Sequence, residues 1–209
     1  MKKDSIISEE LKKCICLRVG KLDFSEVTDE DIEKITEMDI RAVTFNGELT
    51  DVEIEDLAIF PNLTSLMISH FFVGESDVRT LSKLSKLKVI QFSDCDFEEI
   101  ESLMTPEYDI LAFASCSGME DLKMPKTRVL RMVGCEVDFL YINPKEIEKL
   151  YIQNSEIVNY STLEYTPNLL EVNFDGSKVF DLDGNEVDEI KVSDATHLSF
   201  EEEFHLEDR

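Results

Sequence analysis

The chain has 209 residues, of which 43% are hydrophobic, so it can bury the core of a single domain. Its 46 acidic residues outnumber its 21 basic residues and give a formal net charge of −25 at pH 7. This charge argues against binding to nucleic acid or to an anionic membrane, because both are themselves negatively charged. It permits a basic protein partner without requiring one, since acidity also keeps a protein soluble and monomeric.

The first segments are expected to form a cap and a strand. Residues 1–13 place a few apolar side chains among charged ones, which predicts a short N-terminal helical cap. A strand is expected at residues 14–21. The N-terminal residues lack the apolar run of a secretory signal, and no apolar stretch approaches the roughly 18 residues of a membrane-spanning helix.

Three helices are expected in the N-terminal half. Thr28, followed by three acidic residues, predicts the N-cap of the first helix. Thr50 and Glu53 have the spacing of a capping box for the second, and residues 76–84 predict the third. The apolar sides of these helices are expected to carry Ile32, Ile35 and Met38, then Ile54, Leu57 and Ala58, then Val78, Leu81 and Leu84.

One spacing recurs through the whole chain. Apolar residues stand at positions 1, 4 and 6 of each frame, and a small polar or thiol side chain stands at position 9, as in Leu87, Ile90, Phe92 and Cys95. The frames start at residues 14, 40, 63, 87, 108, 127, 147, 169 and 187. An ordinary protein of alternating strands could imitate one such frame, but it would not hold the frame through six consecutive copies.

This spacing resembles the consensus of the leucine-rich repeat family, with short repeats of about 18–26 residues and Cys or Ser in place of Asn at position 9. The resemblance implies an α/β solenoid with the shape of a horseshoe. A parallel β-sheet would line its concave face, and short helices, 3₁₀ segments or turns its convex side. Residues 1–13 would then be the cap, 14–195 about nine repeats, and 196–209 an acidic C-terminal cap or tail. In the later, shorter repeats we expect 3₁₀ segments or turns.

The five cysteines indicate structural thiols. Cys95, Cys116 and Cys135 share position 9, where the resemblance implies buried, unreactive thiols. Cys14 and Cys16 have a spacing that suits zinc poorly, and residues 181–185 resemble a calcium loop too imperfectly, so we interpret the latter as a tight turn. The sequence therefore predicts neither a metal site nor a cofactor, and free thiols favour the cytoplasm.

Catalysis is not expected. His70, His197 and His205 are the candidate general bases, but the frame places no carboxylate to orient any of them. The motifs of nucleophilic, phosphate-binding and zinc-dependent enzymes are also missing from the sequence. We predict that the protein is not an enzyme and has no catalytic residues.

The expected concave face offers the clearest candidate site. Its outward positions carry equal numbers of basic and acidic residues, and its centre is apolar with an Arg and a Tyr at the edge, both expected to point outward. Such a composition is typical of an interaction hot spot. The residues predicted to bind a partner are Met67, Val89, Gln91, Ile110, Ala112, Arg131, Val133, Lys149 and Tyr151.

The function predicted first is a non-catalytic intracellular module that binds another protein on the concave face. A second hypothesis is an acidic inhibitor or immunity protein that neutralises a basic enzyme or toxin, such as a nuclease. A chain that combines acidity with leucine-rich repeats is similar to the ribonuclease inhibitors of animal cells, although their repeats are longer. A third hypothesis is a self-assembling structural scaffold. The sequence leaves these three alternatives open.

Overall fold

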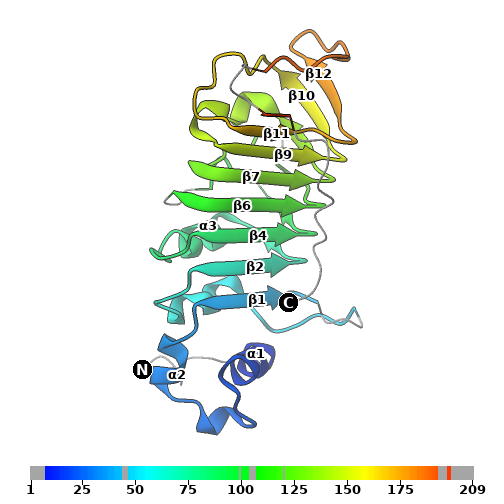
Figure 1. Ribbon diagram of the computed structural model, residues 1–209. Helices are drawn as coiled ribbons and strands as arrows, with labels where there is room; N and C mark the ends of the chain where they lie inside the picture. The colour runs from blue at the N-terminus through cyan, green and yellow to red at the C-terminus, as the bar shows by residue number, and fades with distance from the viewer. Residues whose placement is uncertain are drawn as a thin grey trace.

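The computed structural model describes residues 8–43, 47–98, 100–103, 107–119 and 121–192, and the backbone of 197–198. Its main element is a parallel sheet of eight strands whose spatial order follows the chain (Figure 1). The strands are β1 (Glu37–Arg41), β2 (Ser65–Ser69), β4 (Val89–Ser93), β6 (Tyr108–Ala114), β7 (Thr127–Val133), β9 (Lys149–Gln153), β11 (Glu171–Asn173) and β13 (His197–Leu198). Each strand adds one rung, so the molecule is a solenoid rather than a closed barrel.

The strands lie where the six central frames place them. The register pairs position 4 of each repeat with position 4 of the next, as in Leu66 opposite Ile90, and position 6 likewise, as in Ile68 opposite Phe92. These two columns form the core. The position 4 side chains are each at most 3% exposed: Met38, Leu66, Ile90, Leu111, Leu130, Leu150 and Val172. A strand with one apolar side is stable here because its neighbours bury that side.

Three buried phenylalanines pack together in the core near the middle of the stack. The rings of Phe92 and Phe113 stack with centroids 5.4 Å apart, and the ring of Phe97 meets both edge-on. Such pairs add roughly 0.5–1.5 kcal/mol beyond the burial of their area. Phe97 comes from position 11 of its repeat, so it closes the core from the side opposite the sheet.

A left-handed residue at position 8 ends most of the strands. His70, Asp94, Ser115, Gly134, Asn154 and Gly176 all have positive φ, between 49° and 65°. The backbone N–H at this position donates to the carbonyl at position 7 of the next repeat, for example from Ser115 to Val133 at 2.8 Å. This turn directs position 9 back into the core. The positive φ explains why Gly, Asn and Asp occur at position 8, since these residues tolerate it best.

The N-terminal end differs from the expectation. Residues 14–21 were expected as a strand, but helix α1 (Glu9–Val19) covers most of them. Ser8 is its N-cap and Gly20, in the left-handed conformation, is its C-cap, so local capping decides the structure. Leu11 and Ile15 are fully buried and close the stack beside β1 (Figure 1). Residues 1–7 lie outside the described part, and the domain boundaries remain predictions.

The second frame was expected five residues too late. Helix α2 (Asp29–Glu33) begins with the predicted cap, in which Thr28 and Asp31 exchange hydrogen bonds, but it ends before Ile35 and Met38. Ile40 lies opposite Ile68, at position 6 rather than position 1. The repeat therefore starts at Ile35, which packs in the core instead of on a helix.

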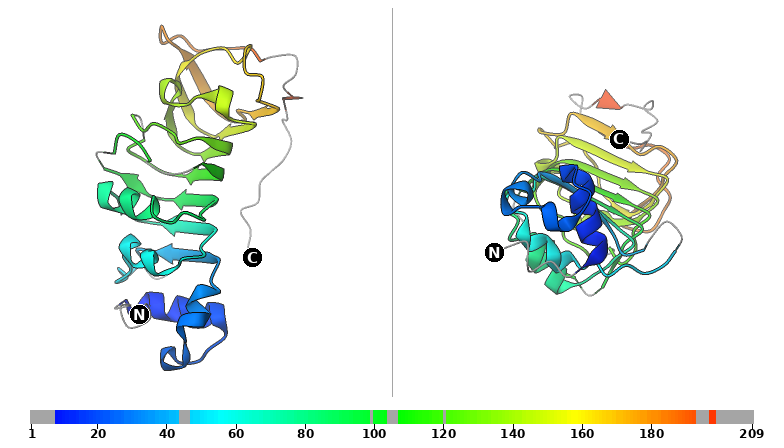
Figure 2. Two further views of the ribbon diagram at one scale, coloured as in Figure 1. Left: turned by 90° about the vertical axis from the view of Figure 1, so that its left-hand side faces the viewer. Right: turned by 90° about the horizontal axis from the view of Figure 1, so that it is seen from below.

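The predictions for the next two helices agree only in part with the structure. The segment η3 (Ile54–Ile59) is a 3₁₀ helix that begins after Glu53, and Ala58 is exposed. Thr50 does not cap it, because its hydroxyl donates to the carbonyl of Arg41 at 2.6 Å. Helix α3 (Glu75–Leu81) begins one residue before the expected range of 76–84 and ends three residues earlier, with Val78 and Leu81 buried on it. The short helices lie on one side of the sheet (Figure 2).

The later repeats replace helices with 3₁₀ segments and with short strands. The 3₁₀ segments are η4 (Phe139–Tyr141) and η5 (Pro144–Glu146), and a further one near the N-terminus is η2 (Phe24–Glu26). The additional strands were not predicted. They are β3 (Phe72–Val73) with β5 (Asp96–Phe97), and β8 (Glu136–Asp138), β10 (Glu156–Tyr160) and β12 (Lys178–Asp181) in a second parallel sheet. A tight turn follows β12, where Gly184 donates to the carbonyl of Asp181.

The last frame was also misplaced. A strand starting at Val187 was expected, but Leu198 of β13 lies opposite Val172, so the last repeat starts eight residues later. The side chains of His197 and Leu198, together with residues 193–196 and 199–209, lie outside the described part, and so does most of the expected C-terminal cap or tail. None of the described helices is long and apolar enough to cross a membrane.

Candidate functional site

The sheet has one face turned away from the core, which we call the front face. It carries positions 3, 5 and 7 of each repeat, because side chains alternate along a strand. All nine residues predicted to bind a partner occupy these positions. Five of them form a single row across adjacent strands at position 5: Met67, Gln91, Ala112, Arg131 and Tyr151. The fold therefore brings the predicted residues together on one surface, although their role remains a prediction.

The front face is unevenly exposed. Met67, Gln91 and Ala112 are partly exposed, whereas Tyr151 is only 5% exposed. Val129, at position 3 of β7, is only 4% exposed. Tyr151 was predicted to point outward. Its register does place it on the front face, but its side chain is buried there.

Charged groups on the front face are paired at both ends of the row. Lys149 lies 2.8 Å from Glu171 on the C-terminal side, and Arg41 lies 3.4 Å from Asp39 on the N-terminal side. Burial, followed by the carboxylate of Glu171, raises the pKa of the Tyr151 hydroxyl. Such exposed or half-exposed pairs contribute little stability, about 0–1 kcal/mol each.

The middle of the front face carries no formal charge. Strands β4 and β6 present Val89, Gln91, Ser93, Ile110, Ala112 and Ala114 at positions 3, 5 and 7. An uncharged centre with polar residues around it is the composition found in the buried part of protein interfaces.

The thiols at position 9 form a column beneath the turns. Cys95, Cys116 and Cys135 are 1%, 5% and 4% exposed, and each sulfur donates to a carbonyl of its own strand at 3.4 Å. The hydrogen bond with Cys95, followed by burial, raises the pKa of Cys116, and burial raises that of Cys135, whereas the hydrogen bond with Cys116 lowers the pKa of Cys95. All three sulfurs are buried, and inaccessible thiols are poor nucleophiles.

Of the three candidate general bases, the structure describes the side chain of His70 alone. His70 is exposed in a left-handed turn, His197 lies in β13 with its side chain outside the described part, and His205 lies outside it altogether. Among the residues that the structure describes, no three His, Cys, Asp or Glu side chains are grouped as metal ligands.

Comparison with known proteins shows the fold alone. No protein-family model matches the sequence, and no curated protein matches it. The solved structure of internalin C2 from Listeria monocytogenes is similar, with a TM-score of 0.51 and 14% identity over 95% of this chain and 96% of that one. Internalin F from the same organism gives a TM-score of 0.39 and 12% identity over 88% of this chain and 73% of that one. The first of these likenesses shows a solenoid of the leucine-rich-repeat kind.

Proposed function

We propose that this chain is a non-catalytic protein-interaction module that binds a partner protein on the front face, as the concave side of a horseshoe. The observation that supports the proposal is the row of five position 5 side chains across β2, β4, β6, β7 and β9, which runs through the uncharged centre on β4 and β6. A repeat protein offers such a surface without any catalytic group, because its strands present side chains in a regular array.

The partner's contacts would centre on Gln91, Ala112 and Arg131, which are partly exposed and adjacent. Arginine is enriched at hot spots because its planar guanidinium combines apolar contact with several hydrogen-bond donors. Tyr151 would contribute mainly by packing under Arg131. A cytoplasmic location fits the proposal, since all five cysteines are free thiols.

The net charge of −25 favours one second candidate, an acidic inhibitor or immunity protein directed at a basic enzyme or toxin. The two candidates differ in what holds the partner. A basic partner bound through the acidic surface should dissociate at high salt, whereas a partner docked on the uncharged centre should not.

The test is capture of native proteins on the immobilised chain, washed first at low and then at high salt. The variant Ala112→Asp places a charge at the centre of the front face, and Leu140→Asp is its matched control on the exposed segment η4. The front-face proposal predicts a partner that withstands salt, is lost with Ala112→Asp and is kept with Leu140→Asp.

Each other outcome contradicts the front-face proposal. A basic partner that both variants retain and that high salt removes would support the inhibitor. If no protein is captured and the purified chain has a multiple of its 24.0 kDa mass in solution, the protein is a self-assembling scaffold.

A further inference from the structure

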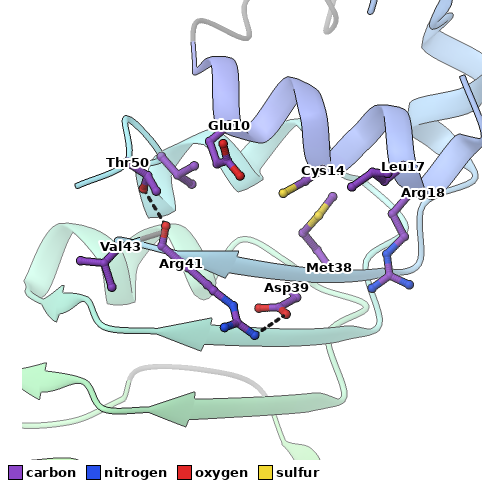
Figure 3. A pocket seen from close by; sticks show the side chains of 10 residues that line it. Glu10, Cys14, Leu17, Arg18, Met38, Asp39, Arg41, Val43 and Thr50 are labelled. Carbon is purple, nitrogen blue, oxygen red and sulfur yellow. Dashed lines mark hydrogen bonds and ion pairs between the residues drawn. The ribbon is translucent and has the colours of Figure 1, made fainter. Parts of the chain in front are cut away.

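A pocket of about 390 Å³ lies between α1 and β1, at the N-terminal end of the sheet (Figure 3). It contains none of the nine residues predicted to bind a partner, although Asp39 and Arg41 of its lining lie at the N-terminal end of the front face. Helix α1 contributes Glu10, Cys14, Leu17 and Arg18, which recur at helical spacing on one side. Strand β1 and the segment that follows it contribute Met38, Asp39, Arg41, Val43, Thr50 and Val52.

One part of the lining is apolar and continues to the rim. Met38, Val43 and Val52 form this part with the thiol of Cys14. Leu17 stands at the rim and is 83% exposed. On the other side Leu49, 85% exposed, pairs with Val43 through a β-bridge. Two strongly exposed leucines beside one hollow are an apolar surface that a partner would bury.

The other part of the lining carries two carboxylates that are only partly engaged. The Oδ2 of Asp39 accepts from Arg41 at 3.4 Å, a long hydrogen bond, while its Oδ1 is inaccessible and has no hydrogen-bond partner. Glu10 binds Lys13 through Oε2 at 3.0 Å. A buried acceptor without a donor is destabilising, so an N–H donor in the pocket would stabilise Asp39 once its carboxylate turned Oδ1 toward the opening.

The charged groups of the lining balance formally, Glu10 and Asp39 against Arg18 and Arg41, but the carboxylates dominate at Cys14. Burial raises the pKa of the Cys14 thiol, and the carboxylates of Glu10 and Asp39 raise it further against the smaller opposing effects of Arg18 and Lys13. Arg18 is itself drawn toward Glu37, 3.8 Å away. A positive group entering the pocket would therefore be attracted to the side where Glu10 and Asp39 lie.

We propose that this pocket accepts a lysine or arginine side chain from a basic partner protein. The alkyl stem would lie on Met38 and Val43 with Leu17 at the rim, and the cationic head would meet Glu10 and Asp39. Long basic side chains bind in this way, with the stem on apolar surface and the head at a charged group. The net charge of −25 would accelerate the approach of such a partner.

The experiment uses the full chain with ¹³C-labelled methionine methyl groups and small probes. N-acetyl-lysine methylamide and N-acetyl-arginine methylamide are compared with N-acetyl-norleucine methylamide, which has the stem without the charge. We expect both basic probes to shift the Met38 methyl signal in a saturable way and the neutral probe to do so much more weakly. The methyl of Met124, in the segment between β6 and β7, is the internal control and should not shift.

Two variants test the assignment of the pocket. Glu10→Gln combined with Asp39→Asn should weaken the lysine probe about tenfold or more. Asp188→Asn combined with Glu189→Gln changes the net charge equally at exposed positions elsewhere and should have no effect. Cys14→Met keeps both carboxylates but fills the pocket, so it should also abolish the shift if the probe enters there.

Three results would overturn the proposal. They are equal shifts with the norleucine probe, a response unchanged in the Glu10/Asp39 variant, and no saturable shift with either basic probe. The front-face variant Ala112→Asp should leave the response of Met38 unchanged, so failure of this proposal and failure of the front-face proposal can be told apart.

Discussion

The guanidinium of Arg131 lies over the ring of Tyr151, 5.4 Å from its centroid, where β7 and β9 meet on the front face. A cation over an aromatic ring is worth about 0.5–1 kcal/mol at exposed sites and more where water is excluded. Because Tyr151 is only 5% exposed, its ring is also a packing element of the sheet. The two residues therefore have different consequences when they are removed.

Replacing Tyr151 should reduce stability far more than replacing Arg131. We expect Tyr151→Ala to lower the free energy of unfolding by about 3 kcal/mol, because a buried ring is lost. Arg131→Ala should cost about 1 kcal/mol or less, and Tyr151→Phe should cost little, since the ring remains. Urea unfolding followed by circular dichroism measures all three. Equal losses for Arg131→Ala and Tyr151→Ala would contradict the packing role of the ring.

The glycines at left-handed positions predict a graded series of stabilities. Gly134→Ala should cost about 1–2 kcal/mol, because φ is +64° but no atom lies closer than 3.7 Å to the new Cβ. Gly118→Ala should cost about 3 kcal/mol or more, since φ is +70° and the Cβ would lie on the Phe97 carbonyl oxygen. Gly74→Ala, at negative φ and with nothing closer than 3.9 Å, is the control without backbone strain; it should cost only the loss of a favourable N-cap residue, about 0.5–1 kcal/mol.

One substitution at position 8 should stabilise the protein. Ser115 has φ of 52°, and replacing it by Gly should raise the free energy of unfolding by about 0.5–1 kcal/mol through relief of backbone strain. Urea unfolding of the two variants measures both changes in the free energy of unfolding, an increase for Ser115→Gly and a decrease for Gly134→Ala. If Ser115→Gly is destabilising, position 8 does not carry the strain that its geometry indicates.

The central repeats could be predicted because their spacing repeats many times. From Leu63 to Ser177 the apolar positions and the strand register agree, since only one register buries both position 4 and position 6. The end repeats could not be predicted in the same way. Ile35 and Met38 fit a helix by spacing as well as they fit a strand, and the end of α2 at Glu33 decides between them.

The sequence predicts which residues share the front face, but it does not predict how exposed each of them is. Alternation along the strands placed Ala112 and Tyr151 on the same face, because side-chain direction follows from position alone. Their different exposure depends on packing between neighbouring strands, which one sequence does not reveal. The α1–β1 pocket was missed altogether, because residues 14–21 were expected as a strand. The cap signals at Ser8 and Gly20 could have corrected that expectation.

The N-terminus of α1 should make stability depend on pH. Hydrogen bonds from the backbone of Glu9 and from the Ser8 hydroxyl lower the pKa of Asp51 from 3.8 to about 2. Because the folded-state pKa lies below the unfolded value, this contribution is fully present above pH 3.8 and is lost as the pH falls through about 2.

The variant Asp51→Asn tests this pH dependence. At pH 7 it should be less stable than the natural chain by about 1 kcal/mol, as for other losses of a helix cap. The difference should shrink as the pH is lowered from about 4 toward 2, because the natural chain then loses the charge as well. Asp188→Asn is the control at an exposed position. A difference that stays constant over this range would show that the charge of Asp51 does not stabilise the helix.

The cysteines should separate into two classes. Cys14 and Cys16 are partly exposed on α1, whereas Cys95, Cys116 and Cys135 are buried. Iodoacetamide should therefore modify at most two thiols of the native chain within minutes, and all five after denaturation, as counted by mass spectrometry. Rapid native labelling of Cys116 would show that the column at position 9 opens to solvent.

The most direct test of the front-face account is site-specific photo-crosslinking. A photoreactive phenylalanine analogue at position 112, in the centre of the front face, is compared with the same analogue at position 140 on η4. The account predicts that position 112 crosslinks the captured partner and that position 140 does not. Crosslinking only from position 140, with the partner still captured, would contradict it.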